Sequence, residues 1–253
     1  MDLLGIGAIV SGGASGLGRA AAMALARGGA KVAVIDLAGE AASSLAQELG
    51  GIHVPADVTN ESSVGQALDL AERTHGLSRI LINCAGVATP IPLVAGDGQP
   101  TSMCDFSKVI SINLLGTLGL VSNFAARLRG SPTIGEESGV VINTASVAAF
   151  DGQPGQVAYA ASKGGIVAMG LPMARELAEF KIRVMTIAPG IFKTPLLAGL
   201  PREVQTSLEA QVPFPSRMGE PEEFAQLVMA IIANPMLNGE TIRLDGAMRM
   251  GAT

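Results

Sequence analysis

The sequence predicts an α/β fold, a Rossmann-type doubly wound parallel sheet of about seven strands. Two observations carry this prediction. Short apolar runs alternate with helical patterns along the whole chain, and no repeat or linker-like change of composition interrupts them. The chain has 253 residues, of which 48% are hydrophobic and 15% charged, enough to bury one large core. We therefore interpret residues 1–253 as a single domain that binds a cofactor and carries out catalysis.

The predicted elements follow one another in strict alternation. The apolar runs that we assign to strands cover 6–11, 31–36, 52–55, 79–83, 139–144, 182–188 and 240–244. The helical patterns cover 19–27, 38–49, 61–74, 103–130, 157–180 and 221–233. Residues 87–103 are rich in proline and glycine, which predicts a loop.

The stretch 191–218 is long, apolar and without a period, and it contains four prolines. This profile favours a lid over the substrate rather than a core element. Four apolar side chains would form its inner surface: Leu196, Leu197, Leu200 and Phe214.

Composition and charge exclude several classes of function. A net charge of −5 and an aromatic content of 3% argue against a nucleic-acid or membrane partner. Cys84 and Cys104 have neither metal-binding nor disulfide spacing, and we expect His53 and His75 to lack partners, so we predict no metal site. We see no signal peptide, transit peptide or membrane span, and reduced thiols are expected. These points together predict a cytoplasmic protein.

A glycine-rich turn follows the first apolar run. Glycine stands at positions 12, 16 and 18, and an alanine-rich helical pattern comes directly afterwards. In this order of strand, turn and helix, backbone N–H groups can face a pyrophosphate at the positive end of the helix. We therefore predict that Gly12, Gly16 and Gly18 bind the phosphates of a dinucleotide.

Carboxylates follow the second and third apolar runs. Asp36 stands 18 residues after Gly18, where an acid can bind the adenosine ribose hydroxyls. Because such an acid repels a 2′-phosphate, we predict NAD rather than NADP; the alternative is a cap or turn aspartate. Asp57 has two interpretations, an acceptor for the adenine amino group or the cap of a helix that begins near Glu61.

Small residues follow the fourth apolar run, in the sequence Asn83-Cys84-Ala85-Gly86. They would let the chain pass close to the cofactor, although simple packing is an alternative for Cys84. Further along, Asn113 lies among apolar neighbours in the predicted helix 103–130. A buried amide is costly unless it is hydrogen-bonded. It could bend the helix, hold a water, or be satisfied within the core.

Tyr159 and Lys163 stand four residues apart in the predicted helix 157–180, so they share one helix face. An ammonium beside a phenol favours the phenolate and lowers the pKa of the tyrosine from about 10. Such a tyrosine can exchange a proton with a substrate oxygen. Ser146, at the end of the fifth apolar run, could hydrogen-bond the same oxygen; the alternative is an ordinary surface Tyr and Lys.

The candidate residues support one another because they fall at the same edge of the predicted sheet. In a doubly wound sheet, ligands bind at the carboxyl ends of the strands. The candidate residues that follow predicted strands all fall at those ends: Gly12, Asp36, Asp57, Asn83, Ser146 and Pro189.

At this point the chain resembles the short-chain dehydrogenase/reductase family. The resemblance lies in the glycine turn, in Asn83 to Gly86, in Asn113, and in the set Ser146, Tyr159 and Lys163. Longer runs are similar to one branch, the type 2 3-hydroxyacyl-CoA dehydrogenases, also described as 17β-hydroxysteroid dehydrogenases type 10; they cover 142–150, 161–167, 184–190, 211–217 and 238–246. The stretch from Val87 to Met103 departs from that branch and borders the substrate cleft.

The resemblance implies a set of site residues and a homotetramer. Catalytic roles fall to Asn113, Ser146, Tyr159 and Lys163, and substrate contacts to Ser146, Gln153 and Tyr159. Contacts with NAD are implied for Ser15, Leu17, Asp36, Asp57, Val58, Cys84, Tyr159, Lys163, Phe192 and Thr194. The other cofactor-binding positions are Gly12, Gly16, Gly18, Asn83, Ala85, Gly86 and Pro189.

The implied activity is the reversible, NAD-dependent oxidation of a 3-hydroxyacyl-CoA to a 3-ketoacyl-CoA in fatty acid metabolism. Tyr159 would act as acid/base, Lys163 would lower its pKa and hold the nicotinamide ribose, Ser146 would orient the substrate oxygen, and Asn113 would hold a water. Because the lid is apolar, a dehydrogenase of steroids or other secondary alcohols is an alternative. A non-catalytic NAD-binding scaffold is a further alternative.

Overall fold

Seven parallel strands form one sheet in the computed structural model, which describes residues 1–198 and 202–251. Their spatial order is β3-β2-β1-β4-β5-β6-β7, so the chain changes direction of winding between β1 and β4. The strands are β1 (Gly7–Ser11), β2 (Lys31–Ile35), β3 (Ile52–Val54), β4 (Ser78–Asn83), β5 (Gly139–Thr144), β6 (Ile182–Pro189) and β7 (Thr241–Leu244). The predicted fold class is confirmed.

Helices connect the strands. They are α1 (Gly16–Arg27), α2 (Gly39–Glu48), α3 (Glu61–His75), α4 (Met103–Ile110), α5 (Gly116–Leu128), α6 (Val157–Leu177), α7 (Pro195–Ala198), α8 (Arg202–Glu209) and α9 (Pro221–Ala233). A π-helical turn (Ser111–Leu115) joins α4 to α5, and short 3₁₀ turns lie at Val147–Ala149 and Ala178–Phe180. The bounds agree with the predicted helices to within three residues, apart from the two short helices α7 and α8.

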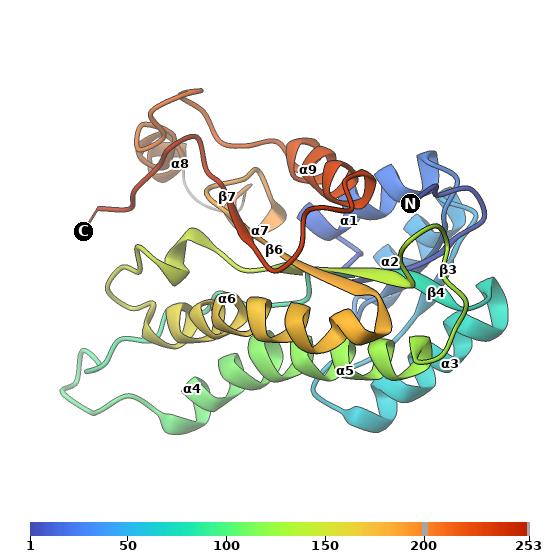
Figure 1. The fold of residues 1–253 in the computed structure, drawn as a ribbon. Coiled ribbons are helices and arrows are strands. Elements are labelled where there is room, and N and C mark those ends of the chain that lie inside the picture. Colours follow the sequence, from blue (N-terminus) through green and yellow to red (C-terminus); the bar gives the residue numbers. More distant parts are fainter. Residues whose placement is uncertain (199–201, 252–253) are drawn as a thin grey trace.

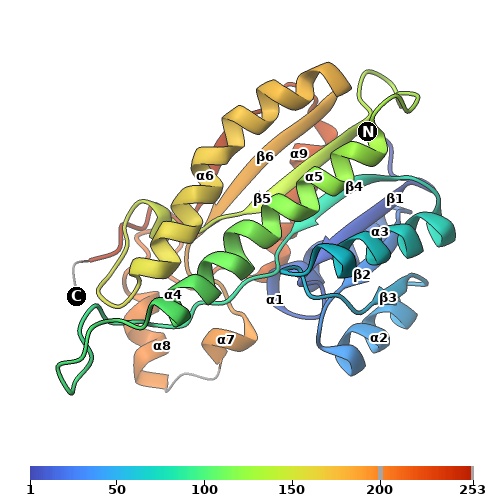
Figure 2. The same ribbon diagram turned by 90° about the horizontal axis from the view of Figure 1, so that it is seen from below.

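The helices cover both faces of the sheet. In Figure 1, α1 and α9 lie above it and α4, α5 and α6 below it. Figure 2 shows α3, α5 and α6 side by side across the lower face. All five residues of β1 are buried, and they alternate between the layers: Ala8 and Val10 join the core with α1 and α9, whereas Ile9 joins the core with α3 and α5. This double burial explains the continuous apolar runs.

Two glycines allow the turn after β1 to pack closely. A Cβ on Gly12 would lie 2.6 Å from the backbone nitrogen of Ala85, and one on Gly18 would lie 2.2 Å from the carbonyl oxygen of Gly12. Gly12 also has φ +63°, a conformation that side chains disfavour. The turn therefore brings the end of β1, the start of α1 and the end of β4 into direct contact.

The helix from Met103 to Leu128 is interrupted only by the π turn around Asn113. Among the described residues it is also the helix with the length and hydropathy of a membrane span, and 44% of that apolar stretch is buried inside the fold. Phe124 and Leu128 lie in the core beside the sheet. A core helix of a globular protein has these properties as well.

The predicted lid is more structured than the sequence indicates. It contains α7 and α8, and three of its apolar side chains, Phe192, Val212 and Met218, are buried. Its two ends are joined by backbone hydrogen bonds, from Lys193 to the Gly219 carbonyl and from Gly219 to the Ile191 carbonyl. The lack of a period in the sequence thus conceals local structure, because the paired ends shorten the loop and Pro195 begins the short helix α7. That the segment covers a substrate stays a prediction.

Two of the four apolar side chains named for the lid lie outside the described residues. Leu200 lies outside the described residues, and the side chain of Leu196 does as well. Leu197 is half-buried, and Phe214 is 83% exposed, so Phe214 does not line an enclosed surface in this chain.

The core beneath α5 provides a test of the fold. Phe124 is 2% exposed and packs between α3, α5 and the sheet. Phe124→Ala should lower the free energy of unfolding by about 3–5 kcal/mol, because it removes buried apolar contacts and leaves a cavity. Urea unfolding followed by circular dichroism measures this change. Met236→Ala, at a side chain 87% exposed, should change it by less than about 0.5 kcal/mol. Equal effects at both positions would contradict the assigned core.

Candidate active site

The carboxyl edge of the sheet collects the polar residues that the sequence singles out. The glycine turn follows β1, Asp36 follows β2, Asp57 follows β3 and Ser146 follows β5. Because β1 to β7 are parallel and hydrogen-bonded as neighbours, these ends lie along one edge. The predicted site residues are thus brought together there.

The start of α1 has the properties of a phosphate site. Ser15 occupies the N-cap position, but its side chain makes no capping hydrogen bond with the described residues. Its hydroxyl and the first N–H groups of α1, including those of Gly16 and Leu17, are therefore available to an anion. A Cβ on Gly16 would lie 3.2 Å from Cγ2 of Thr194, so Thr194 covers this turn from the lid side.

Asp36 is held between two segments. One carboxylate oxygen accepts from the Ala14 N–H at 2.9 Å and the other from the Ala38 N–H at 2.9 Å. His53 contacts the Asp36 carbonyl through Nε2 at 3.2 Å and the Ser43 hydroxyl through Nδ1 at 3.1 Å. The expectation that His53 lacks partners is wrong, because its ring closes the gap between β3 and α2. Asp36 is therefore fixed beside the glycine turn.

Asp57 does not cap the helix. Its carboxylate accepts from the backbone and hydroxyl of Thr59, which lowers the pKa of Asp57, whereas Asn60 caps α3 by accepting from Ser63. The capping interpretation is wrong, because the helix begins three residues later than an Asp57 cap requires. Val58 packs against α5, where a Cβ on Gly116 would lie 2.7 Å from its side chain.

A row of buried polar side chains crosses the central strands at this edge. The Ser11 hydroxyl donates to Oδ1 of Asn83 at 3.3 Å, and Nδ2 of Asn83 donates to Oδ1 of Asn143 at 2.9 Å. The adjacent Cys84 thiol contacts the Thr144 hydroxyl at 3.3 Å, and burial raises the pKa of Cys84 to about 11. Cys84 is therefore a protonated, packed thiol, and Asn83 joins the ends of β1, β4 and β5.

Asn113 is satisfied by the chain itself. Its amide oxygen accepts from the Val87 N–H at 2.8 Å, and its Nδ2 donates to the Val87 carbonyl at 2.9 Å and to the Ser162 hydroxyl at 3.0 Å. The Asn113 carbonyl accepts from Thr117. The amide thus fastens the strand end after Gly86 to α6. That it also holds a water stays a prediction.

Tyr159 and Ser146 meet at the start of α6. Ser146 caps the turn Val147–Ala149 by accepting from the Ala148 N–H at 3.1 Å. A side-chain hydrogen bond with Ser146 lowers the pKa of Tyr159, but burial is the larger effect and raises it above the usual value. The expected lowering by Lys163 does not dominate in this structure, because a desolvated phenol favours its neutral form.

Lys163 lies one turn from Tyr159, with Nζ 5.8 Å from the centroid of the tyrosine ring. It is 5% exposed and donates to the Thr144 carbonyl at 2.7 Å. Burial lowers the pKa of Lys163 to about 8. A Cβ on Gly86 would lie 3.6 Å from this Nζ, so the strand end after β4 passes directly over the ammonium.

The remaining predicted contacts lie around this centre. Pro189 ends β6, and Phe192 is 5% exposed and packs its ring against Gly219, so its side chain serves the core. Gln153 donates through Nε2 to the Gly251 carbonyl at 3.1 Å. Ala85 donates its N–H to the Ser11 hydroxyl at 3.4 Å. These positions border the site, and their contacts with cofactor or substrate stay predictions.

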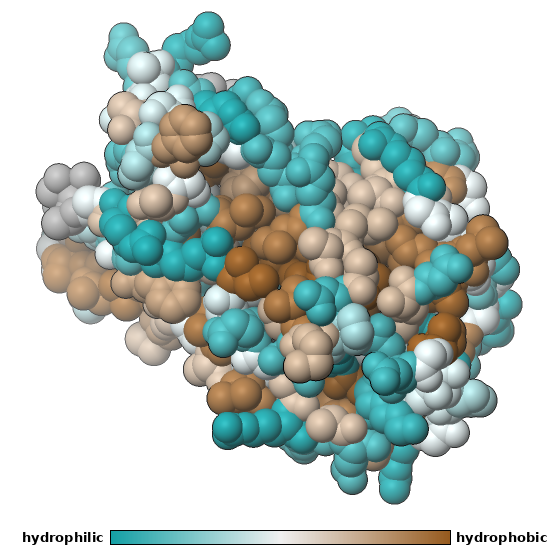
Figure 3. All heavy atoms as spheres, turned by 45° about the horizontal axis from the view of Figure 1, so that its top comes forward, coloured by the Kyte–Doolittle hydropathy of each residue, from teal (hydrophilic) through white to brown (hydrophobic). Residues whose placement is uncertain are grey.

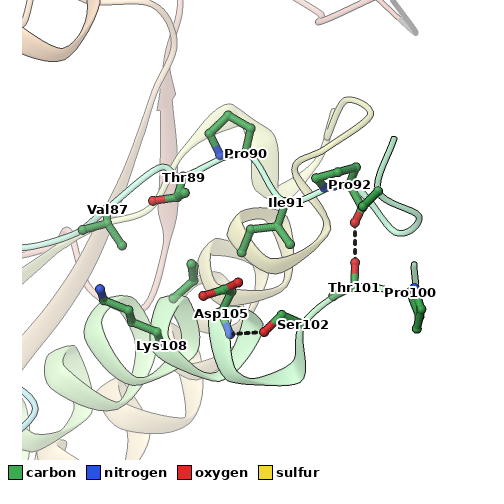
Figure 4. Close-up of a pocket in the computed structure, with 12 residues that line it drawn as sticks. Val87, Thr89, Pro90, Ile91, Pro92, Pro100, Thr101, Ser102, Asp105 and Lys108 are labelled. Carbon is green, nitrogen blue, oxygen red and sulfur yellow. Dashed lines mark hydrogen bonds between the residues drawn. The ribbon is translucent and has the colours of Figure 1, made fainter. Parts of the chain in front are cut away.

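A cavity of about 470 Å³ opens between residues 87–102 and the start of α4 (Figure 4). It begins at Val87, the residue that Asn113 fastens, and its walls combine apolar and hydroxyl side chains with Lys108 and Asp105. Ile91 ties the outer wall to α6 by donating its N–H to the Gly155 carbonyl at 2.7 Å. The volume is in the range of small-molecule sites.

The sequence patterns did not predict three residues of the site, because these residues act through backbone or hydroxyl groups that are common in any sequence. The Thr144 carbonyl accepts a hydrogen bond from Lys163, and the Ser162 hydroxyl accepts one from the Asn113 amide. The Val87 N–H donates to the amide oxygen of Asn113. A position at the end of a strand was the only signal for Thr144. Leu37, which follows Asp36 and is 71% exposed, offers apolar surface next to that carboxylate.

The arrangement fits a dinucleotide. The glycine turn leaves room for a close approach that a Cβ would fill, the start of α1 offers N–H donors, and Asp36 stands at the next strand end. Lys163, Tyr159 and Ser146 then form a group able to move a proton at the far side of the switch point.

Comparisons with known proteins agree with this chemistry. The model of the short chain dehydrogenase family matches residues 7–205. The human 3-hydroxyacyl-CoA dehydrogenase type-2 is 51% identical over 250 residues, covering 97% of this chain and 96% of the human one. The Drosophila melanogaster protein of the same name is 49% identical over 247 residues, with 96% of each chain covered.

A solved structure is similar over the whole fold. The crystal structure of 3-hydroxyacyl-CoA dehydrogenase type-2 from Mycobacterium avium has a TM-score of 0.94 and 40% identity, with 98% of each chain covered. The family resemblance drawn from the motifs is confirmed. The chain belongs to the short-chain dehydrogenase family.

Proposed function

We propose that the protein catalyses the reversible, NAD-dependent oxidation of 3-hydroxyacyl-CoA to 3-ketoacyl-CoA. The observation that carries this proposal is the group of Ser146, Tyr159 and Lys163 at the sheet edge that also bears the dinucleotide turn. Relatives named for this activity match nearly the whole chain at about half identity, which supports the choice of substrate class.

As a short-chain dehydrogenase, the protein uses a nicotinamide cofactor. We propose that this cofactor is NAD. Asp36 places a carboxylate beside the glycine turn, where it would accept from ribose hydroxyls and repel a 2′-phosphate. Arg19, the basic side chain nearest in sequence to that turn, pairs with Glu48 at 3.2 Å and so is engaged elsewhere.

Tyr159 serves as the acid/base in this proposal. When bound, the nicotinamide supplies the hydride acceptor. During oxidation, the Tyr159 phenolate takes the proton of the substrate hydroxyl, and during reduction the phenol returns it to the ketone oxygen. Ser146 donates its hydroxyl proton to the same substrate oxygen, because a hydroxyl can donate while it accepts from the Ala148 N–H.

Lys163 stabilises the phenolate. In a poorly hydrated site, an ammonium within about 6 Å of a phenolate favours the charged pair. Because Thr144 and Gly86 enclose Nζ, the ammonium cannot turn away toward solvent. Asn113 acts on this arrangement through Val87, the residue after Gly86, whose backbone N–H and carbonyl it binds.

The cavity between residues 87–102 and α4 supports a substrate larger than a simple alcohol. Its volume of about 470 Å³ and its mixed apolar and hydroxyl walls suit an acyl chain with amide groups. A steroid or another secondary alcohol is the second candidate, favoured by the apolar walls formed by Ile91 and Val109.

We also propose a homotetramer in the cytoplasm. Long apolar side chains remain exposed on three helices, namely Met103 on α4, Leu115 and Leu118 at α5, and Val157 and Leu171 on α6. Figure 3, turned so that the top of Figure 1 comes forward, shows further apolar side chains gathered across the middle of the face in view. Apolar surface on more than one face is typical of chains that assemble by two different interfaces.

The proposed function predicts the outcome of a substrate panel. Purified protein with NAD should oxidise short, branched or long 3-hydroxyacyl-CoA esters with kcat/KM at least about tenfold above that for steroid alcohols.

The role of Tyr159 predicts a further result in the same assay. Tyr159→Phe should lower kcat by about 10²–10⁴-fold, because the phenyl ring cannot accept the proton. Calorimetry should give a Kd for NAD within about threefold of wild type. A Tyr159→Phe variant with near-normal kcat would contradict the role of Tyr159 as acid/base.

The cofactor choice predicts a second result. Asp36→Ser should lower the ratio of kcat/KM with NAD to that with NADP by at least about tenfold, because it removes the repulsion of the 2′-phosphate. Glu40→Ser, an exposed acid at the start of α2, is the matched control and should leave the ratio unchanged. Equal use of both cofactors by the wild type would refute the role given to Asp36.

The buried charge of Lys163 predicts a gain of stability on its removal. Its folded pKa is about 8 and its unfolded value 10.5, so the unfolded chain binds more protons between these values. Wild-type stability therefore rises with pH across that window, and the full penalty applies below pH 8. At pH 7, Lys163→Met should raise the free energy of unfolding by about 1–3 kcal/mol while abolishing turnover.

Urea unfolding of the cofactor-free protein at pH 7, 9 and 10 measures this effect. The difference between variant and wild type should shrink as the pH approaches 10.5. A variant that is less stable than wild type at pH 7 would show that the hydrogen bond to Thr144 outweighs the burial of the charge.

A further inference from the structure

The segment from Asp245 to Gly251 forms a tightly built turn beside the active site. Gly246 and Ala247 have φ +59° and +65°, and Met248 is fully buried, with its N–H donating to the Asp245 carbonyl at 3.1 Å. A non-glycine residue such as Ala247 is uncommon at positive φ and persists where its surroundings fix it. The turn is therefore an ordered part of the fold. In Figure 2 this red segment ends beside the yellow-green stretch that precedes α6.

Arg243, at the end of β7, holds the turn together and binds a second segment. Its Nε donates to Asp245 at 2.7 Å and its Nη2 to the Met248 carbonyl at 2.9 Å. Both terminal nitrogens also reach the Asp151 carboxylate, at 2.5 and 3.3 Å. The guanidinium stacks over the Phe150 ring at 5.2 Å.

The Arg243 contacts are sheltered from solvent. Side-chain exposure is 20% for Arg243, 16% for Asp151 and 7% for Asp245, so the pair is screened less than surface ion pairs. The Met250 N–H and Arg243 both lower the pKa of Asp151, with Arg243 the larger effect. Asp151 is thus held from two directions by the turn.

Asp151 belongs to the short segment that links the two proton-handling residues. Ser146 lies five residues before it, just after β5, and Tyr159 lies eight residues after it, in α6. The same segment contains Gln153, whose side chain donates to the Gly251 carbonyl at 3.1 Å. The turn therefore contacts the connection between Ser146 and Tyr159 at two points.

The turn also contacts two other walls of the site. A Cβ on Gly190, directly after β6, would lie 2.8 Å from Cβ of Asp245. A Cβ on Gly246 would lie 2.6 Å from the Val212 side chain, and the Phe214 N–H donates to the Gly246 carbonyl at 3.3 Å. Val212 and Phe214 stand where the lid returns to the body. One turn thus meets the lid, the end of β6 and the segment before α6.

We propose that Arg243 is a positioning residue of the active site, which holds residues 150–155 in register with the turn 245–251 and thereby fixes Ser146 and Gln153 relative to Tyr159. A planar guanidinium with five donors can satisfy Asp151, Asp245 and the Met248 carbonyl at the same time, whereas an ammonium cannot match this geometry. The catalytic part of this inference rests on the proposed function.

Paired variants test the inference. Arg243→Met removes the link, and Arg249→Met is the matched control, since Arg249 is 63% exposed and contacts Asp245 but, among the described residues, makes no hydrogen bond to Asp151. We expect Arg243→Met to lower kcat/KM for a 3-hydroxyacyl-CoA roughly tenfold or more, because small misplacements of reacting groups cost this much. The Kd for NAD should stay within about twofold, because the dinucleotide turn lies elsewhere. Arg249→Met should leave both values unchanged.

Further variants separate positioning from general stability. Arg243→Lys should restore only part of the loss, and Asp151→Asn should reproduce part of it, with little added effect in the double variant. Hydrogen exchange of the cofactor-free protein should rise in 147–156 and 245–251 in Arg243→Met alone. If Arg243→Met fails to fold, Asp151→Asn carries the same test.

The opposite results are equally defined. Equal behaviour of Arg243→Met and Arg249→Met, or a loss of NAD affinity as large as the loss of kcat/KM, would overturn the proposal. Additive effects of the Asp151 and Arg243 variants would do so as well. If the wild type does not oxidise 3-hydroxyacyl-CoA esters, the proposed function fails, while the hydrogen-exchange comparison still decides whether Arg243 fixes residues 147–156.

Discussion

The buried ammonium of Lys163 is the constraint on which the rest of the site depends. It is 5% exposed, it bonds to the Thr144 carbonyl, and burial lowers its pKa to about 8. A charge in such a place opposes folding, so the surrounding sheet must hold its acceptor rigidly. Thr144 is the last residue of β5 and pairs in register with Ile187 of the buried strand β6. The ends of the central strands therefore supply the rigidity that this buried lysine requires.

The same edge joins the two halves of the site across the switch point. The Gly12 turn lies against the Ala85 backbone with no space for a Cβ, and the row from Ser11 through Asn83 to Asn143 binds β1, β4 and β5 by side chains. The phosphate end of the cofactor site and the proton-handling end are consequently parts of one packed unit. Fixed geometry of this kind lets a proton and a hydride leave neighbouring atoms without rearrangement of the backbone.

Much of the fold and of the site followed from periodicity and from the positions of polar residues after apolar runs. The seven strands, and the placement of Asp36, Ser146, Tyr159 and Lys163 at one edge, were predicted because double burial and parallel topology leave few other arrangements. The direction in which the pKa of Tyr159 shifts was not predicted, because it depends on how deeply the phenol is buried. Helix-capping by Asn60 and the helices of the lid depend on local turns and paired ends that one sequence does not specify. Backbone acceptors such as the Thr144 carbonyl cannot be predicted from residue type, because every residue has a carbonyl.

The division between sheet and surrounding segments separates chemistry from selectivity. Ser146 lies just after β5, and Tyr159 and Lys163 lie on α6, whereas the surrounding segments are residues 87–102, which wall the cavity, the lid and the turn 245–251. These three segments differ in composition from the sheet, yet each is held by a specific bond: Val87 to Asn113 of the π turn, Lys193 to Gly219 across the ends of the lid, and Asp245 of the turn to Arg243 of β7. Substitutions elsewhere in these segments can reshape the surroundings of the site while these bonds keep the proton-handling geometry. A fold organised in this way can keep one reaction and change the alcohol on which it acts.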